Sequence, residues 1–201
     1  HGVATHGVSA YPSDVTAQMI KNFENGGAAV NQLCELANLK LSVVPLDLDK
    51  PTRDFSQDTA MELEETIAAM QVGFKSVNAE CDLLILGEMG IGNSTIAAAI
   101  NYACFGGSVI DWVGMGTSSS NTILEHKVSV IEKATSINRS QNPIEILMNL
   151  GGKEQAAIFG AVMACRVMKI PVIIDGYICR LFLLIDLRFH DIITPEFWRH
   201  L

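Results

Sequence analysis

The sequence predicts an α/β fold, in the form of a doubly wound, mostly parallel sheet flanked by helices, with part of a small helical subdomain. Two short apolar runs, residues 83–86 (LLIL) and 171–175 (PVIID), have the composition of strands buried on both faces. Helical segments alternate with these runs, as in a parallel sheet. A glycine-rich turn follows the first run and an Asp-Gly pair ends the second, at the sheet edge where such folds bind ligands.

Chain length and charge limit the domain organisation and the partners. The 201 residues, 49% of them hydrophobic, suffice for one α/β domain with a substantial core. We expect one domain over residues 1–201, both termini incomplete, with residues 1–38 as a helical segment and 39–201 as the sheet core. The net charge of −8 argues against a general nucleic-acid partner, which needs a basic face. No apolar run approaches the roughly 18 residues that cross a bilayer, so no membrane partner is expected.

The cysteines and histidines give no sign of a metal or redox site. The five cysteines are scattered singly without a CxxC pair, so we expect buried thiols in a reducing compartment, the cytoplasm. The sequence also opens without a signal peptide. His1 and His6 have no nearby cluster of carboxylates or cysteines, and we expect them to be polar loop residues in a loop over residues 1–12.

The first part of the chain is predicted to form three helices and a strand. Ser13-Asp14 should cap a helix that ends at Phe23, and a second helix should cover residues 28–37. Residues 41–48 (LSVVPLDL) have the composition of a strand, which Pro45 restricts to a sheet edge or an early end. Residues 59–77 should form an amphipathic helix with an acidic start.

The second part is predicted to be mainly helical. The alanine-rich segment after the first glycine turn favours helix, with Asn93, Ser94 or Thr95 as the N-cap. An apolar piece at 109–116 ends in a second glycine turn, and Ser118–Ser120 should cap the next helix. Further helices are expected at residues 121–136, at 143–150 after a first-turn proline, at 154–168, and from residue 179 onward.

The glycine turn at residues 87–92 (GEMGIG) is an anion site in outline, because unpaired amides at a helix start attract negative charge. Its spacing fits a P-loop, except that Asn93 stands where the lysine is required. Glu88 would also repel a triphosphate. A tight turn without a ligand, a site for a single phosphate, and a site for a ligand that needs a carboxylate all remain open.

Five segments of the sequence together resemble one known family. They are HGV with GVSAYPSDVTAQM, VVPLDLDKPTRDF with AMELEE, GEMGIGNST, GGKEQAAIFGA, and PVIIDGYI. In order and spacing they resemble the nicotinate-nucleotide–dimethylbenzimidazole phosphoribosyltransferases, from His1 to about Cys179. The resemblance implies transfer of ribose 5-phosphate from nicotinate mononucleotide to 5,6-dimethylbenzimidazole in cobalamin biosynthesis. It also implies a homodimer and no metal or other cofactor.

The resemblance also implies roles for particular residues. Glu88 is the catalytic candidate, because its carboxylate can stabilise the positive charge that develops on ribose. The acceptor base implies a second group, a general base that removes its N–H proton. The residues implied to bind nicotinate mononucleotide are Gly87, Gly90, Gly92, Gly114, Gly116, Lys127, Asp175 and Gly176. Those implied to border the benzimidazole pocket, mostly within residues 1–38, are Ser9, Tyr11, Gln18 and Met89.

The chain departs from the family at its ends. The family carries its general-base glutamate in a glycine-rich C-terminal segment that is not found before Leu201. We therefore expect a fragment truncated at both ends, inactive unless another chain completes the site. Two alternatives remain: a non-catalytic remnant that binds ligand or dimerises, and a nucleotide hydrolase that uses the glycine loop.

Overall fold

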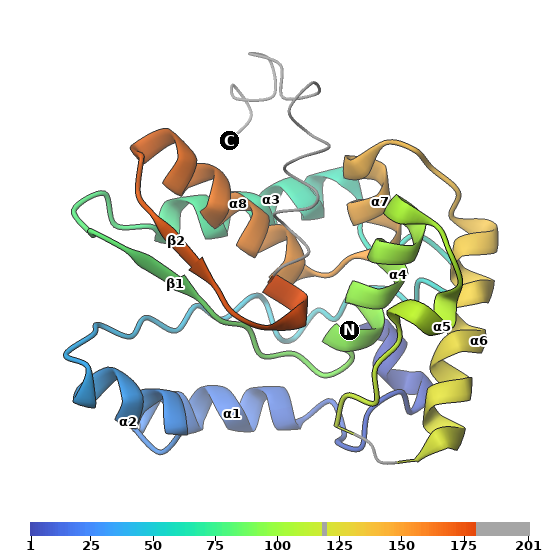
Figure 1. The fold of residues 1–201 in the computed structure, drawn as a ribbon, viewed down its shortest axis with the longest axis horizontal. Helices are drawn as coiled ribbons and strands as arrows, with labels where there is room; N and C mark the ends of the chain where they lie inside the picture. The colour runs from blue at the N-terminus through green and yellow to red at the C-terminus, as the bar shows by residue number, and fades with distance from the viewer. Residues whose placement is uncertain (118–119, 180–201) are drawn as a thin grey trace.

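The computed structural model describes residues 1–117 and 120–179. The expected helix from residue 179 onward lies outside these ranges except for Cys179, and so do Ser118 and Ser119 of the expected helix cap. Helices dominate the described chain (Figure 1). In order, the elements are the 3₁₀ helix η1 (Gly2–His6), α1 (Val15–Glu24), α2 (Ala29–Leu36), α3 (Leu63–Ser76), β1 (Leu84–Leu86), α4 (Asn93–Phe105), α5 (Val109–Trp112), α6 (Asn121–Ile137), α7 (Pro143–Leu150), α8 (Lys153–Met168) and β2 (Val172–Ile174).

The two predicted apolar runs pair as a parallel sheet, which confirms the α/β class. β1 and β2 are in register from Leu84 opposite Val172 to Leu86 opposite Ile174. The prediction that both strands are buried on both faces is wrong, since Ile85 and Ile173 are each 47% exposed. Successive strand residues point to opposite faces, and here the face that carries these two isoleucines is open.

The strand predicted at residues 41–48 is not formed. No residue of this segment pairs with β1 or β2, and most of it has no regular structure. Pro45 has no N–H to offer a neighbouring strand, and Asp47 has a left-handed backbone with a φ of 49°. The expected loop at residues 1–12 is also only partly a loop, because it contains η1.

The helices predicted from periodicity are confirmed, with small shifts at their ends. Asn142 caps α7, where its Oδ1 accepts a 2.9 Å hydrogen bond from the amide of Ile144 after the first-turn Pro143. The N-cap expected for α4 is wrong. Gly92 occupies that position with a φ of 100°, a conformation that favours glycine. The Asn93 side chain instead donates a hydrogen bond to Glu88.

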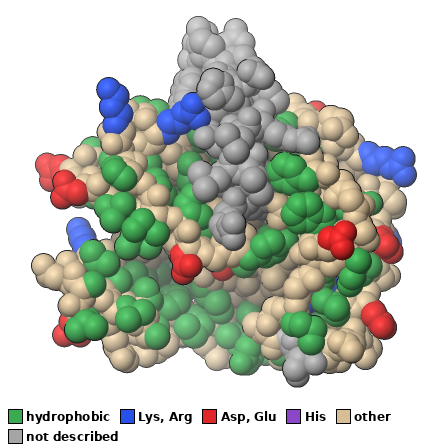
Figure 2. Space-filling model, viewed as in Figure 1, with side chains coloured by type: hydrophobic (Ala, Val, Ile, Leu, Met, Phe, Trp, Pro, Cys, Tyr) green, Lys and Arg blue, Asp and Glu red, His purple; other side chains and the backbone are tan. Residues whose placement is uncertain are grey.

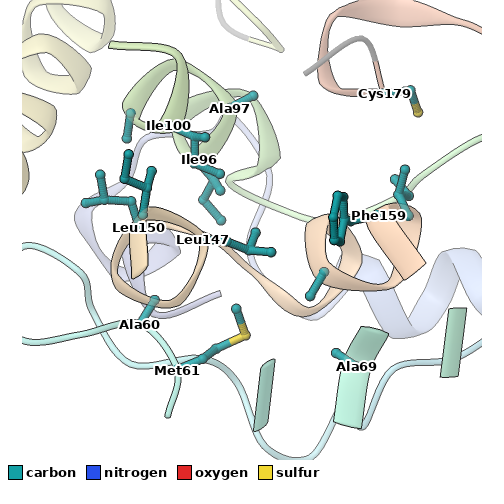
Figure 3. Close-up of a cluster of buried hydrophobic side chains, with 14 of the residues drawn as sticks. Ala60, Met61, Ala69, Ile96, Ala97, Ile100, Leu147, Leu150, Phe159 and Cys179 are labelled. Carbon is teal, nitrogen blue, oxygen red and sulfur yellow. The ribbon is translucent and has the colours of Figure 1, made fainter. Parts of the chain in front are cut away.

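The core is built on a close contact between α3 and α8. A Cβ on Gly73 would overlap the carbonyl of Ala157, and a Cβ on Gly160 would overlap the carbonyl of Met70, so glycine lets the two backbones approach. Next to this pair, the apolar face of α4 packs against α7 (Figure 3). The side chains in this part of the core include Ile96 and Ile100 of α4, Leu147 and Leu150 of α7, and Phe159 of α8.

Helices α1 and α2 are less enclosed. In Figure 1 they run below the two strands, whereas α3 and α8 lie above them. Neither helix contains a fully buried residue, and Leu36 of α2 is 86% exposed. Hydrophobic side chains gather on the surface over these helices (Figure 2). None of the described helices is long and apolar enough to span a membrane.

Gly160→Ala should lower the free energy of unfolding by about 1–3 kcal/mol, because overpacking at the α3–α8 contact outweighs the gain in helix propensity. Urea unfolding at a fixed pH measures this change. Ala68→Ser, on the exposed side of α3, is the control and should change the stability by less than about 0.5 kcal/mol. An unchanged midpoint for Gly160→Ala would contradict the contact.

Candidate active site

Glu88 stands on the turn that joins β1 to α4. Gly92, the last residue of the turn, lets the chain enter the helix with a positive φ. Helix α4 begins with the next residue, Asn93, whose side-chain Nδ2 donates a hydrogen bond to Glu88 Oε2 across the turn. The turn therefore holds a carboxylate and its amide partner at the carboxyl end of the first strand.

The partners of the Asn93 amide set its orientation. Its Oδ1 accepts hydrogen bonds from Gln155 Nε2 at 3.1 Å and from His1 Nε2 at 2.5 Å. With the oxygen so occupied, the NH₂ group is left to face Glu88. Asn93 is only 3% exposed, so water cannot readily replace these partners.

His1 forms an ion pair with Glu154 beside this amide. His1 Nε2 lies 3.1 Å from Glu154 Oε2, and the His1 side chain is 3% exposed. Burial acts to lower the pKa of His1, but the Glu154 carboxylate and the hydrogen bonds outweigh it, so the pKa is raised. Burial acts to raise the pKa of Glu154, and the charge of His1 outweighs it, so that pKa is lowered. Both shifts favour the charged pair.

Burial also controls the Glu88 carboxyl. It raises the pKa of Glu88, and the nearby charge of Glu154 adds to the effect. The hydrogen bond from Asn93 and the positive charge of His1 act in the opposite direction. Glu88 is thus a partly desolvated carboxylate whose negative charge is supported from one side by a fixed amide donor.

Lys127 connects the second glycine turn to the start of α4. Its Nζ donates to the carbonyl oxygens of Gly114 and Met115, each at 3.3 Å, and lies 3.5 Å from Ser94 Oγ. The side chain is 1% exposed, and burial lowers its pKa. An ammonium group is therefore held where the two glycine turns meet, next to Gly116.

The end of β2 reaches the same region through Tyr177. Its hydroxyl accepts a 3.0 Å hydrogen bond from Asn101 Nδ2 of α4 and donates one of 2.8 Å to the Trp112 carbonyl of α5. Asp175 and Gly176 precede it and are exposed. Burial raises the pKa of the Cys179 thiol to about 11, with help from the charges of Glu88 and Asp175.

The expected benzimidazole residues are only partly brought together. Ser9 Oγ lies 3.1 Å from Thr117 Oγ1, and the amide of Ala10 also donates to that hydroxyl at 3.2 Å, so the N-terminal segment touches the second glycine turn. Tyr11 follows and is exposed. Met89 is half-buried on the Glu88 turn, and Gln18 is exposed on α1. Among the described residues, no hydrogen bond joins Gln18 to the Glu88 network.

The sequence did not identify three members of this network, His1, Glu154 and Gln155, nor the pairing of His6 outside it. His1 was expected to be a polar loop residue and is instead buried in an ion pair, because η1 carries it onto the start of α8. His6 was also expected to be a polar loop residue, yet its Nε2 lies 2.7 Å from Asp54 Oδ2. Glu154 and Gln155 were taken only as the start of a helix. Polar residues next to glycine at the starts of two alanine-rich helices were the signal that could have identified them.

Comparison with known proteins shows the family of this chain. The sequence model of a family described as "Phosphoribosyltransferase" matches residues 1–193. The nicotinate-nucleotide–dimethylbenzimidazole phosphoribosyltransferases of Ruegeria pomeroyi and Rhizobium etli are 49% and 48% identical to this protein, each over 89% of its chain. The chain belongs to this phosphoribosyltransferase family.

The fold of this family member also matches solved structures. The crystal structure of CobT from Thermus thermophilus superposes with a TM-score of 0.81 and 31% identity, over 94% of this chain and 63% of that one. The chain spans about half the length, 53%, of both curated relatives. No group of three or more potential metal ligands occurs among residues 1–117 and 120–179.

Glu154→Gln should remove a pH-dependent part of the stability. Because folding raises the pKa of His1, the ion pair stabilises the fold below pH 6.5 and this contribution disappears as the pH rises through the raised pKa. Because folding lowers the pKa of Glu154, its contribution is present above pH 4.5 and is lost as the pH falls through the lowered pKa.

Urea unfolding between pH 5 and pH 9 measures this effect. At pH 6 we expect Glu154→Gln to lose about 1–3 kcal/mol relative to the unaltered chain, with the difference shrinking above pH 6.5. Glu132→Gln, an exposed site on α6, is the matched control and should run parallel to the unaltered chain. A pH-independent loss in Glu154→Gln would count against the ion pair.

Proposed function

We propose that this protein transfers ribose 5-phosphate from nicotinate mononucleotide to 5,6-dimethylbenzimidazole, giving α-ribazole 5′-phosphate and nicotinate. The observation that carries the proposal is the meeting of two glycine turns, one presenting Glu88 and the other bound by Lys127 of α6, in a member of this family. The names of the relatives support the substrates, although the chain spans only about half their length.

The reaction suits a carboxylate in this position. The bond between ribose C1′ and the pyridinium nitrogen breaks, and its electron pair leaves with nicotinate, which needs no proton. Positive charge develops on the ribose, and the ionised Glu88 carboxylate stabilises it at short range in a partly desolvated site. A benzimidazole nitrogen then bonds to C1′, and the proton on the other ring nitrogen passes to a general base.

The donor phosphate is assigned to the second glycine turn. Lys127 Nζ is a buried cation at this turn, and it can turn its N–H groups from the carbonyls of Gly114 and Met115 to a phosphate beside Gly116. A single phosphate needs no P-loop lysine, in agreement with Asn93 at that position. Gly87, Gly90 and Gly92 of the first turn, with Asp175 and Gly176 after β2, are proposed to surround the rest of the donor.

The benzimidazole is assigned to the N-terminal side. Ser9, Tyr11, Gln18 and Met89 are proposed to border it, with residues 1–38 as a helical segment next to the sheet core. Two observations support this placement: the contact of Ser9 with Thr117 of the second turn, and the hydrophobic surface over α1 and α2 in Figure 2.

The general base is proposed to lie outside the 201 residues, in the C-terminal segment implied by the family resemblance. The protein is also proposed to act as a homodimer in the cytoplasm. All five of its cysteines are free thiols, which supports a reducing compartment. A second chain or the remaining segment would then complete the site.

The test is release of nicotinate from nicotinate mononucleotide and dimethylbenzimidazole, measured for the 201-residue chain and for the chain extended past Leu201 by the sequence that its gene encodes. We expect turnover in the extended chain alone, and a loss of about 100-fold or more in its Glu88→Gln variant, with Glu132→Gln as the control. Turnover in the 201-residue chain would show that the general base lies within these residues. No nicotinate release from either protein, with both shown to be folded, would support a non-catalytic remnant instead.

A further inference from the structure

We propose that Asn93 is a positioning residue that fixes the orientation of the Glu88 carboxylate and favours its charged form. Gln155 and His1 hold Asn93 for this purpose, and Glu154 holds His1. The inference rests on the proposed function for its effect on turnover. It concerns residues that the sequence pattern marked only as a missing lysine and the start of a helix.

The direction of the hydrogen bonds carries the inference. Gln155 Nε2 and His1 Nε2 both donate to Asn93 Oδ1, at 3.1 Å and 2.5 Å. A flipped Asn93 amide would turn its oxygen toward the Glu88 carboxylate, which can only accept, and its NH₂ group toward the protonated His1, which can only donate. Both contacts of the flipped amide are unfavourable, so Nδ2 faces Glu88 Oε2. Gln155 adds to this arrangement as placed, through Nε2.

The held amide is useful because Glu88 lacks its full hydration. Hydrogen bonds to a carboxylate favour its charged form, and this support matters most where water is excluded. An Asn93 that moved freely would let Glu88 rotate away from the turn. The asparagine thus occupies the P-loop lysine position with a different task, which is to direct a neighbouring carboxylate instead of a phosphate.

Among the described residues, three titratable groups interact with the charge of Glu88 from other elements. Glu154 on α8 opposes its negative charge, and His1, ahead of η1, supports it. Cys179, after β2, lies close enough to interact with that charge but is a neutral thiol, its pKa being raised to about 11 by burial. Of these partners and Asn93, only Asn93 donates a hydrogen bond to Glu88 among the described residues.

Asn93→Asp tests the inference with little change of shape. The aspartate keeps oxygens for Gln155 and His1 but replaces the donor that faces Glu88 with a second carboxylate. Like charges at this distance disfavour ionisation, so Glu88 should hold its proton to higher pH. Asn138→Asp is the matched control, because Asn138 is also a buried asparagine whose Nδ2 donates a hydrogen bond, to the Phe55 carbonyl at 2.8 Å outside this network.

Two readouts on the extended chain are needed. In turnover of nicotinate mononucleotide with dimethylbenzimidazole, Asn93→Asp should lower kcat by up to about 100-fold. The acid limb of the pH profile of kcat should move to higher pH in Asn93→Asp, whereas in Asn138→Asp it should stay where it is in the unaltered chain. In a ¹³C NMR titration of the glutamate carboxyls, assigned with Glu88→Gln, the Glu88 midpoint should move up in Asn93→Asp only.

The outcomes separate the two proposals. An unmoved Glu88 titration in folded Asn93→Asp would overturn the positioning role, whether or not the protein turns over. Equal kcat losses in Asn93→Asp and Asn138→Asp with unchanged acid limbs would also overturn it, since they would reveal a general loss of structure. No turnover in the unaltered protein, with the Glu88 titration shifted as expected, would overturn the proposed function and leave the positioning of Glu88 supported.

Discussion

The burial of polar groups around Asn93 constrains the candidate site more than any other feature. Hydrogen-bonding groups removed from water are costly unless they are paired, and charges more so. The side chains of Asn93, His1 and Gln155 are all buried, and Asn93 Oδ1 pairs with both His1 Nε2 and Gln155 Nε2, although Gln155 Oε1 has no hydrogen-bond partner among the described residues. The residues come from the N-terminus, the start of α4 and the start of α8, so pairing them sets how these three segments meet. Glu88 takes its place from that arrangement.

The core fixes where these polar groups can meet. The glycines at the α3–α8 contact let the helices approach closely, which places the start of α8, with Glu154 and Gln155, against the glycine turn. The apolar face of α4 packs on α7, and this packing places Asn93, at the start of α4, opposite Gln155 at the start of α8. Apolar packing therefore positions both helix starts, and the polar network orients the side chains between them.

Much of the fold followed from local patterns, and the rest depended on partners far along the chain. Helical periodicity located α1 and α3, because an apolar stripe is a property of the segment itself. The segment at 41–48 has strand composition but no strand partner, which composition alone cannot reveal. Glu88 and Lys127 were proposed as site residues through the resemblance to the family. His1 was missed because its partner Asn93 is 92 residues away and Glu154 is farther still, and no local pattern records such a contact.

The central claim is that the two glycine turns form one donor site around Glu88 and Lys127. A crystal structure of the protein with nicotinate mononucleotide tests it most directly. The account predicts the ribose C1′ facing the Glu88 carboxylate, with the Asn93 amide unchanged, and the phosphate within about 3 Å of Lys127 Nζ beside Gly116. A donor bound away from Glu88, or with its phosphate held elsewhere while Lys127 keeps its carbonyl partners, would contradict the account.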